Sequence, residues 1–132
     1  MPLVIDASIA VCWAFDDEDQ EKAWLVLDRL GREEAVVPSL WWFEIRNALV
    51  MNERRGRITE LGTSSFLRDV SGLNILIDRD PVDGELIGLA RLHRLTIYDA
   101  AYLELARRRR LALATLDGPL ARAADAEGVV SL

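Results

Sequence analysis

The sequence predicts an α/β fold with a mainly parallel sheet, formed as a single domain over residues 1–132. Short apolar runs alternate with segments of helical periodicity along the whole chain, which is typical of strands joined by helical crossovers. No linker, internal repeat or low-complexity segment divides it. With 132 residues, 51% of them hydrophobic and 29% charged, the chain has the size and composition of one ordinary globular domain.

The first third of the chain predicts one strand and two helices. Residues 2–6 are an apolar run that predicts a buried strand. A short helix over 8–15 follows, with Ser8 as its candidate N-cap. Asp16–Asp17 opens a second helix, whose apolar residues recur at helical spacing until Gly31 ends it.

The middle of the chain repeats this alternation. Residues 35–37 predict a short strand that a proline ends. Ser39 is expected to cap a longer helix that runs to about Arg55, with Gly56 as its C-terminal stop. Another helix begins near Thr59. Strands are then predicted at 74–77, 111–115 and, as a final edge strand, 129–130, and helices at 82–93, 97–109 and 119–127.

Four carboxylates stand out because each lies in or beside an apolar segment, and they are Asp6, Glu44, Asp99 and Asp117. A charge in such surroundings is costly unless it is paired or binds a metal. Asp6 and Asp117 follow predicted strands, and sites in parallel sheets form at the carboxyl ends of strands. We therefore expect at least these two acids at one edge of the sheet.

Carboxylate oxygens are the ligands that Mg²⁺ and Mn²⁺ prefer, and phosphodiester hydrolases use such ions to activate water and offset charge on the phosphate. Ser8 and Thr115 each lie two residues from one of the acids, where a hydroxyl could orient a carboxylate or a bound water.

Each acid also has a structural interpretation. Asp6 could cap a helix, Asp99 could serve the dipole in a first turn, and Asp117 could belong to a turn before a helix. Glu44 could pair with a distant arginine; Arg46 is badly placed, because residues two apart on a helix do not face each other.

Charge and residue types exclude several functions. The net charge of −6 argues against broad coating of nucleic acid. Lys22 is the only lysine, and no phosphate-binding P-loop occurs. The single Cys12 excludes an internal disulfide and, without a basic signal segment or membrane span, favours a cytoplasmic setting. The run Arg107–Arg110 is expected to complement a helix dipole and stay solvated.

Four segments together resemble the PIN-domain family, in particular the VapC-type ribonuclease toxins of toxin–antitoxin pairs. They are V-I-D-A-S at 4–8, P-S-L-W-W-F-E-I-R-N-A-L at 38–49, L-T-I-Y-D-A-A-Y-L-E-L-A at 95–106 and A-T-L-D at 114–117. Their order and spacing match the family pattern across essentially the whole chain.

The resemblance implies a three-layer α/β/α fold with a central sheet of four to five strands, and a Mg²⁺- or Mn²⁺-dependent endoribonuclease. It places Asp6, Glu44, Asp99 and Asp117 at the acidic positions that bind metal and act in catalysis, with Ser8, Asn47 and Thr115 as supporting residues. The partners that it implies are an RNA substrate, an antitoxin protein and a second copy of the chain. The sequence departs from the pattern at Gly118–Pro119, where a basic residue is common.

Two other functions remain open from the sequence. A strand followed by D-x-S is similar to the opening motif of haloacid-dehalogenase-like phosphatases, but Ser8 stands where that family has a second aspartate. A catalytically degenerate PIN-like binding module is the non-enzymatic alternative, and the presence of all four acids speaks against it.

Overall fold

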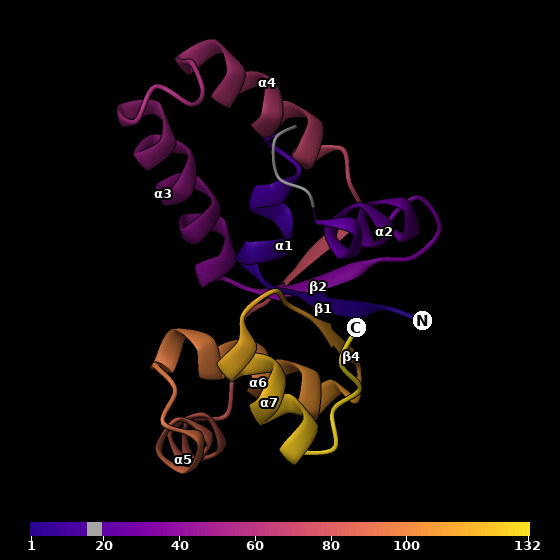
Figure 1. The fold of residues 1–132 in the computed structure, drawn as a ribbon. Helices are drawn as coiled ribbons and strands as arrows, with labels where there is room; N and C mark the ends of the chain where they lie inside the picture. Colours follow the sequence, from indigo (N-terminus) through magenta and orange to yellow (C-terminus); the bar gives the residue numbers. More distant parts are fainter. Residues whose placement is uncertain (16–19) are drawn as a thin grey trace.

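A parallel sheet lies between two groups of helices in the computed structural model, which describes residues 1–15 and 20–132 (Figure 1). The sheet order is β3-β2-β1-β4 and every pairing is parallel. The strands are β1 (Leu3–Ile5), β2 (Ala35–Pro38), β3 (Ile75–Asp78) and β4 (Ala112–Ala114). This arrangement confirms the expected α/β/α fold.

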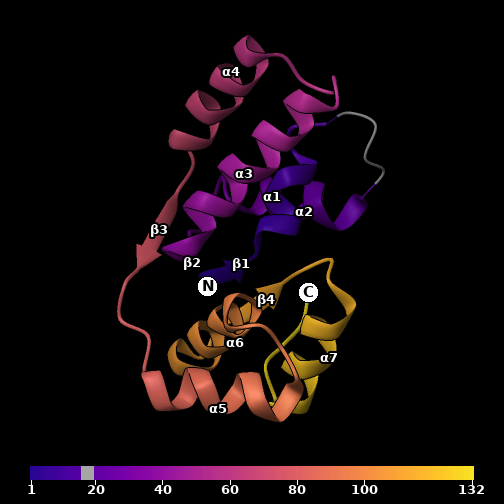
Figure 2. The same cartoon turned by 90° about the vertical axis from the view of Figure 1, so that its left-hand side faces the viewer.

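The helices divide by sequence between the two faces of the sheet (Figures 1 and 2). On one side lie α1 (Ala7–Cys12), α2 (Glu21–Arg29), α3 (Leu40–Arg54) and α4 (Glu60–Ser71). On the other side lie α5 (Asp83–His93), α6 (Ile97–Arg109) and α7 (Gly118–Ala126). None of the helices in the described part of the chain has the length and apolar character to cross a membrane.

The two interior strands, β1 and β2, are buried because helices cover both faces of the sheet. All three residues of β1 and all four of β2 are buried, as expected for the interior strands of a parallel sheet. On the α6 side, residues 100–106 are all buried, and α6 contacts β1, β2 and β4. A helix covered nearly all round has no polar face, so its sequence shows little amphipathicity.

Two helix starts differ from the prediction. The first helix is capped by Asp6 rather than Ser8: its carboxylate accepts a hydrogen bond from the Ile9 backbone N–H, and Ser8 lies inside α1. Ser39 precedes α3 but its side chain makes no capping hydrogen bond, since its backbone is already helical at φ −60° and ψ −27°. The predicted helix start at Asp16–Asp17 lies outside the described residues.

The predicted edge strand at 129–130 is wrong. Gly128 turns the chain with a φ of +74°, and only two backbone hydrogen bonds then reach Leu113: its N–H donates to the Val130 carbonyl, and the Leu132 N–H donates to the Leu113 carbonyl. The result is one isolated bridge between Leu113 and Ser131 in place of a fifth strand.

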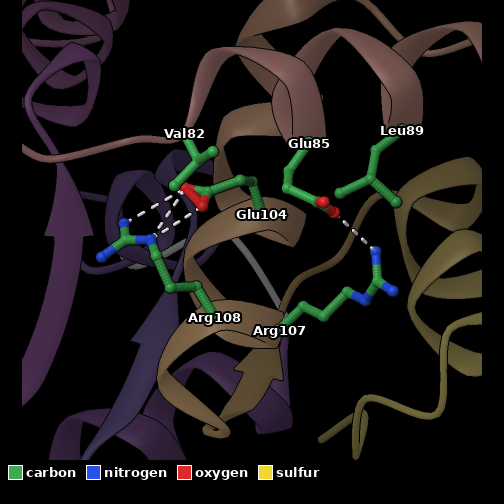
Figure 3. Close-up of a pocket in the computed structure, with 6 residues that line it drawn as sticks. All are labelled: Val82, Glu85, Leu89, Glu104, Arg107 and Arg108. Carbon is green, nitrogen blue, oxygen red and sulfur yellow. Dashed lines mark hydrogen bonds and ion pairs between the residues drawn. The ribbon is translucent and has the colours of Figure 1, made fainter.

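The Arg107–Arg110 run is not simply solvated. Arg108 donates to Glu104 and to Asp78 at 2.8–3.2 Å, although the Glu104 side chain is only 2% exposed. Arg107 pairs with Glu85 across the pocket between α5 and α6 (Figure 3). These pairs join α6 to α5 and to the end of β3, so part of the run holds the fold together.

Candidate active site

Asp6 lies at the carboxyl end of β1 and is almost fully buried, with 5% of its surface exposed. Its carboxylate accepts hydrogen bonds from the Ser8 hydroxyl at 2.6 Å, from the Thr115 hydroxyl, and from the backbone N–H of Ile9 at 3.3 Å. Burial raises the pKa of Asp6, and these hydrogen bonds oppose the rise. The side chain thus caps a helix and faces Thr115 from the neighbouring strand end.

The two hydroxyls join the ends of β1 and β4. Ile5 pairs with Ala114, so Asp6 and Thr115 leave adjacent strands side by side. The Ser8 hydroxyl accepts from the Leu116 N–H, and the Thr115 hydroxyl accepts from the Asp117 N–H, both at 2.9 Å. Each hydroxyl therefore fixes Asp6 and the β4–α7 turn at once.

Glu44 is directed across the molecule by a tyrosine. Glu44 lies on α3, and its carboxylate accepts a 2.5 Å hydrogen bond from the hydroxyl of Tyr102 on α6. Tyr102 is only 1% exposed. Burial raises the pKa of both side chains. The neighbouring Arg46 donates instead to the Trp42 carbonyl at 3.1 Å, and its guanidinium lies 3.4 Å from the centre of the Trp42 ring. Arg46 therefore does not pair with Glu44.

Asp99 and Asp117 sit at the N-terminal ends of α6 and α7. Thr96 caps α6 by accepting from the Asp99 N–H at 3.0 Å, which places Asp99 in the first turn. Asp117 caps α7 by accepting from the Leu120 N–H at 2.9 Å. Asp99 is therefore a first-turn acid and Asp117 belongs to the turn before a helix, as their structural interpretations predicted. Both acids lie at the same edge of the sheet as Asp6.

The four acids influence one another electrostatically. Burial is the main cause that raises the pKa of Asp6, Glu44 and Asp99. The charge of Asp117 adds to the rise at Asp6 and Asp99, and the charges of Asp99 and Asp6 add to it at Glu44. Among the described residues none of the four forms an ion pair with a basic side chain.

The four carboxylates are suitable groups to bind a divalent cation, but they do not converge on a common point. In residues 1–15 and 20–132, no group of three or more Asp, Glu, His or Cys side chains is close enough to hold a metal ion. Asp6 and Glu44 direct their oxygens to hydroxyl donors instead. A bound Mg²⁺ or Mn²⁺ would nevertheless offset the repulsion between these carboxylates, and both ions prefer oxygen ligands.

The remaining predicted residue, Asn47, is exposed on α3, one helical turn after Glu44. No hydrogen bond ties its side chain to the four acids in the described part of the chain. Asn47 therefore stands apart from the network that Ser8 and Thr115 join.

Sequence reasoning missed three residues at this edge of the sheet. Tyr102 was not singled out from the sequence, although its position three residues after Asp99 on a predicted helix places the two side chains on neighbouring positions of one face. Lys22, on α2, donates to the Thr115 carbonyl at 3.2 Å. Arg122 lies against Gly118, where a Cβ would be 3.2 Å from its Nη1 atom. No local pattern in the sequence indicates either of these last two contacts.

Comparison with known proteins agrees with this architecture. Residues 3–126 match the PIN domain family. Ribonuclease VapC3 of Pyrobaculum aerophilum is 30% identical over 125 residues, which are 92% of this chain and 93% of that protein.

Solved structures share the fold. The crystal structure of PAE2754 from the same organism superposes with a TM-score of 0.77 at 26% identity, covering 99% of this chain and 89% of that one. FitAcB from Neisseria gonorrhoeae, at 17% identity, gives a TM-score of 0.68 over 100% of this chain and 96% of that chain. The sheet order, the placement of the acids and the match over nearly the whole chain lead to one conclusion: this protein belongs to the PIN domain family.

Proposed function

We propose that this protein is a metal-dependent endoribonuclease that hydrolyses RNA phosphodiester bonds. The observation that carries the proposal is the set of four acids at one sheet edge, with raised pKa values at three of them and no basic partner among the described residues. Ribonuclease VapC3, which aligns over 92% of the chain, supports the reaction class.

Asp6, Glu44, Asp99 and Asp117 would hold the cation directly or through water. When bound, Mg²⁺ or Mn²⁺ supplies the Lewis acidity that phosphodiester hydrolysis requires. Ser8 and Thr115 orient the Asp6 carboxylate through their hydroxyls. Asn47 is exposed one turn from Glu44, and we assign it a supporting contact on the solvent side.

Tyr102 acts on Glu44 in the same way as the two hydroxyls act on Asp6. Its O–H group holds one Glu44 oxygen and leaves the other available for a ligand. Groups that orient metal ligands in this way commonly change metal affinity or activity by about 10–100-fold when they are lost.

The test is RNA cleavage by purified protein with and without EDTA, alongside Asp6→Asn. Asp69→Asn, a change at an exposed acid on α4, serves as the matched control. We expect cleavage that EDTA and Asp6→Asn abolish and Asp69→Asn leaves intact. Cleavage that survives both chelation and Asp6→Asn would contradict the mechanism.

A catalytically degenerate binding module is the second candidate, because the described acids are not gathered into a ready-made metal group. Such a module would show no metal binding that depends on the acids. Membership of the PIN family leaves the haloacid-dehalogenase-like phosphatase without support.

We further propose that the protein is the toxin of a toxin–antitoxin pair and binds an antitoxin protein and a second copy of itself. Solved relatives include VapBC2 from Rickettsia felis, bound to a fragment of promoter DNA, which has the same fold at 14% identity and a TM-score of 0.69. On this chain, Trp42 and Phe43 are exposed on α3, Phe43 by 68%. Exposed aromatic residues of this kind suit a protein interface.

A further inference from the structure

Two cations reach the turn that joins β4 to α7, which is the turn that carries Asp117. Lys22 reaches it from α2, where its ammonium donates to the Thr115 carbonyl at 3.2 Å. Arg122 reaches it from α7, where its guanidinium lies against Gly118, four residues earlier in the chain. Helical side chains lean toward the N-terminus, so Arg122 is directed back to the start of its own helix.

Neither cation is neutralised by a carboxylate in the described part of the chain. Many of the arginines have such a partner; Arg29, Arg32, Arg107, Arg108 and Arg109 do. Among the described residues Lys22 contacts a neutral carbonyl, so no carboxylate there compensates its charge and two of its three N–H donors have no partner there. Lys22 is half-buried and Arg122 is exposed, so both can be reached from solvent.

The position of these charges matters because the adjacent acids repel an anionic substrate. The protein carries a net charge of −6, and nucleic acid binding depends on cations that contact phosphates. Thr115 links the two kinds of group: its carbonyl accepts from Lys22, and its hydroxyl donates to Asp6. Lys22 and Asp6 therefore contact the same residue, Thr115, one at its carbonyl and the other at its hydroxyl.

We propose that Lys22 and Arg122 form a subsite for an RNA phosphate, which holds a phosphodiester next to the one that is cleaved. The proposal rests on the proposed ribonuclease function and names the contact by which that site retains its substrate.

A purely structural role would also explain the Lys22 contact, as a tie between α2 and the end of β4. Such a role predicts a loss of stability when Lys22 is replaced. It does not predict a change in the salt dependence of RNA binding, nor any similar effect at Arg122, which donates no hydrogen bond in the described structure.

The experiment measures binding of a short fluorescein-labelled single-stranded RNA of mixed sequence, at constant Mg²⁺, by fluorescence anisotropy between about 50 and 200 mM salt. All proteins carry Asp99→Asn so that the RNA stays intact. Lys22→Ala, Arg122→Ala and the double variant are compared with Lys22→Arg and with Arg91→Ala, a change at an exposed arginine on α5.

Each lost phosphate contact reduces the slope of log K against log salt by about 0.7 on a single strand. Because both cations hold one phosphate, we expect a reduction of about 0.7 for the double variant, a smaller reduction for Lys22→Ala and for Arg122→Ala, and none for Lys22→Arg or Arg91→Ala. Slopes equal to that of the parent, or an equal change in Arg91→Ala, would overturn the subsite. Cleavage by the protein without these substitutions is measured separately: if it cleaves RNA and the slopes do not change, only this inference fails.

Discussion

At the scale of single residues, the hydroxyl groups determine how the acids are presented. Asp6 is held by Ser8 and Thr115, and Glu44 by Tyr102. A buried carboxylate that lost such a donor would be left with an unsatisfied acceptor, which typically costs about 1–3 kcal/mol. These donors therefore contribute both to the stability of the protein and to the geometry of the site.

Tyr102→Phe tests the link between α6 and Glu44. The phenyl ring keeps the core filled, while Glu44 loses the donor that orients it. We expect metal affinity, measured by Mn²⁺ titration, and RNA cleavage to fall by about 10–100-fold, with the circular dichroism spectrum unchanged. Unaltered metal affinity would show that Tyr102 does not position Glu44.

Thr115→Val and Thr115→Ser form a matched pair at the strand end. Valine keeps the shape but removes the donor to Asp6 and the acceptor for the Asp117 N–H. We expect Thr115→Val to lower the free energy of unfolding in urea by about 1–3 kcal/mol and Thr115→Ser to recover most of it. Equal losses in both variants would mean that the methyl group, rather than the hydroxyl, matters.

At the scale of elements, the ends of strands and helices assemble the site. Asp6, Asp99 and Asp117 each perform an ordinary task at a helix start, as N-cap or first-turn acid. The parallel sheet then brings these starts to one edge. On the α6 side of the sheet, Arg108 donates to Glu104 on its own helix and to Asp78 at the end of β3. The second of these contacts joins α6 to β3.

Arg108→Met tests the buried ion network. It leaves Glu104, with a side chain only 2% exposed, without its cation, and leaves Asp78 with Arg109 alone at 3.6 Å. Removing one partner of a buried pair typically costs about 3–5 kcal/mol, and we expect a loss of that order in urea unfolding. Arg91→Met, at an exposed position on α5, should be nearly neutral. A loss below about 1 kcal/mol for Arg108→Met would place this pair among weak surface pairs.

The same network predicts a pH dependence. Hydrogen bonds from Arg108 lower the pKa of Asp78. A lowered carboxyl pKa stabilises the folded state above the ordinary value of about 3.9, and this contribution is lost as the pH falls through the folded-state pKa. We therefore expect wild-type stability to fall more steeply in acid than that of Arg108→Met. Parallel curves of unfolding free energy against pH would contradict this role of Asp78.

At the scale of the whole molecule, the alternation of apolar runs and helical patterns was enough to predict the α/β fold and most element positions. It failed where long-range geometry decides the outcome. The edge strand at 129–130 is reduced to one bridge by the turn at Gly128. The Arg107–Arg110 run was predicted to be solvated because Asp78 and Glu85 are more than twenty residues away. Glu104 is only four residues from Arg108, but its burial is a result of the tertiary fold.

The same limit applies to the site. The four acids could be selected from their apolar surroundings and the family pattern. Their contacts with Tyr102 and with the turn near Lys22 and Arg122 could not, because these are made between elements far apart in the sequence.

Mutual repulsion of the acids also predicts a cost to stability. Burial and the charges of Asp99 and Asp6 raise the pKa of Glu44, so its ionised form opposes folding at neutral pH. Glu44→Gln keeps an oxygen that accepts from Tyr102 and removes the charge. We expect a higher melting temperature than wild type in EDTA, together with lost cleavage. A lower melting temperature would indicate that the Glu44 charge is compensated.

The most direct test of the central claim is a calorimetric titration of Mn²⁺ into the wild-type protein and the Asp99→Asn and Asp69→Asn variants. We predict saturable binding to wild type and Asp69→Asn, and binding weakened by more than about 100-fold in Asp99→Asn, because a ligand should matter at least as much as the groups that orient it. Absence of binding to wild type, or equal binding to all three proteins, would contradict the claim that these four carboxylates form a metal centre.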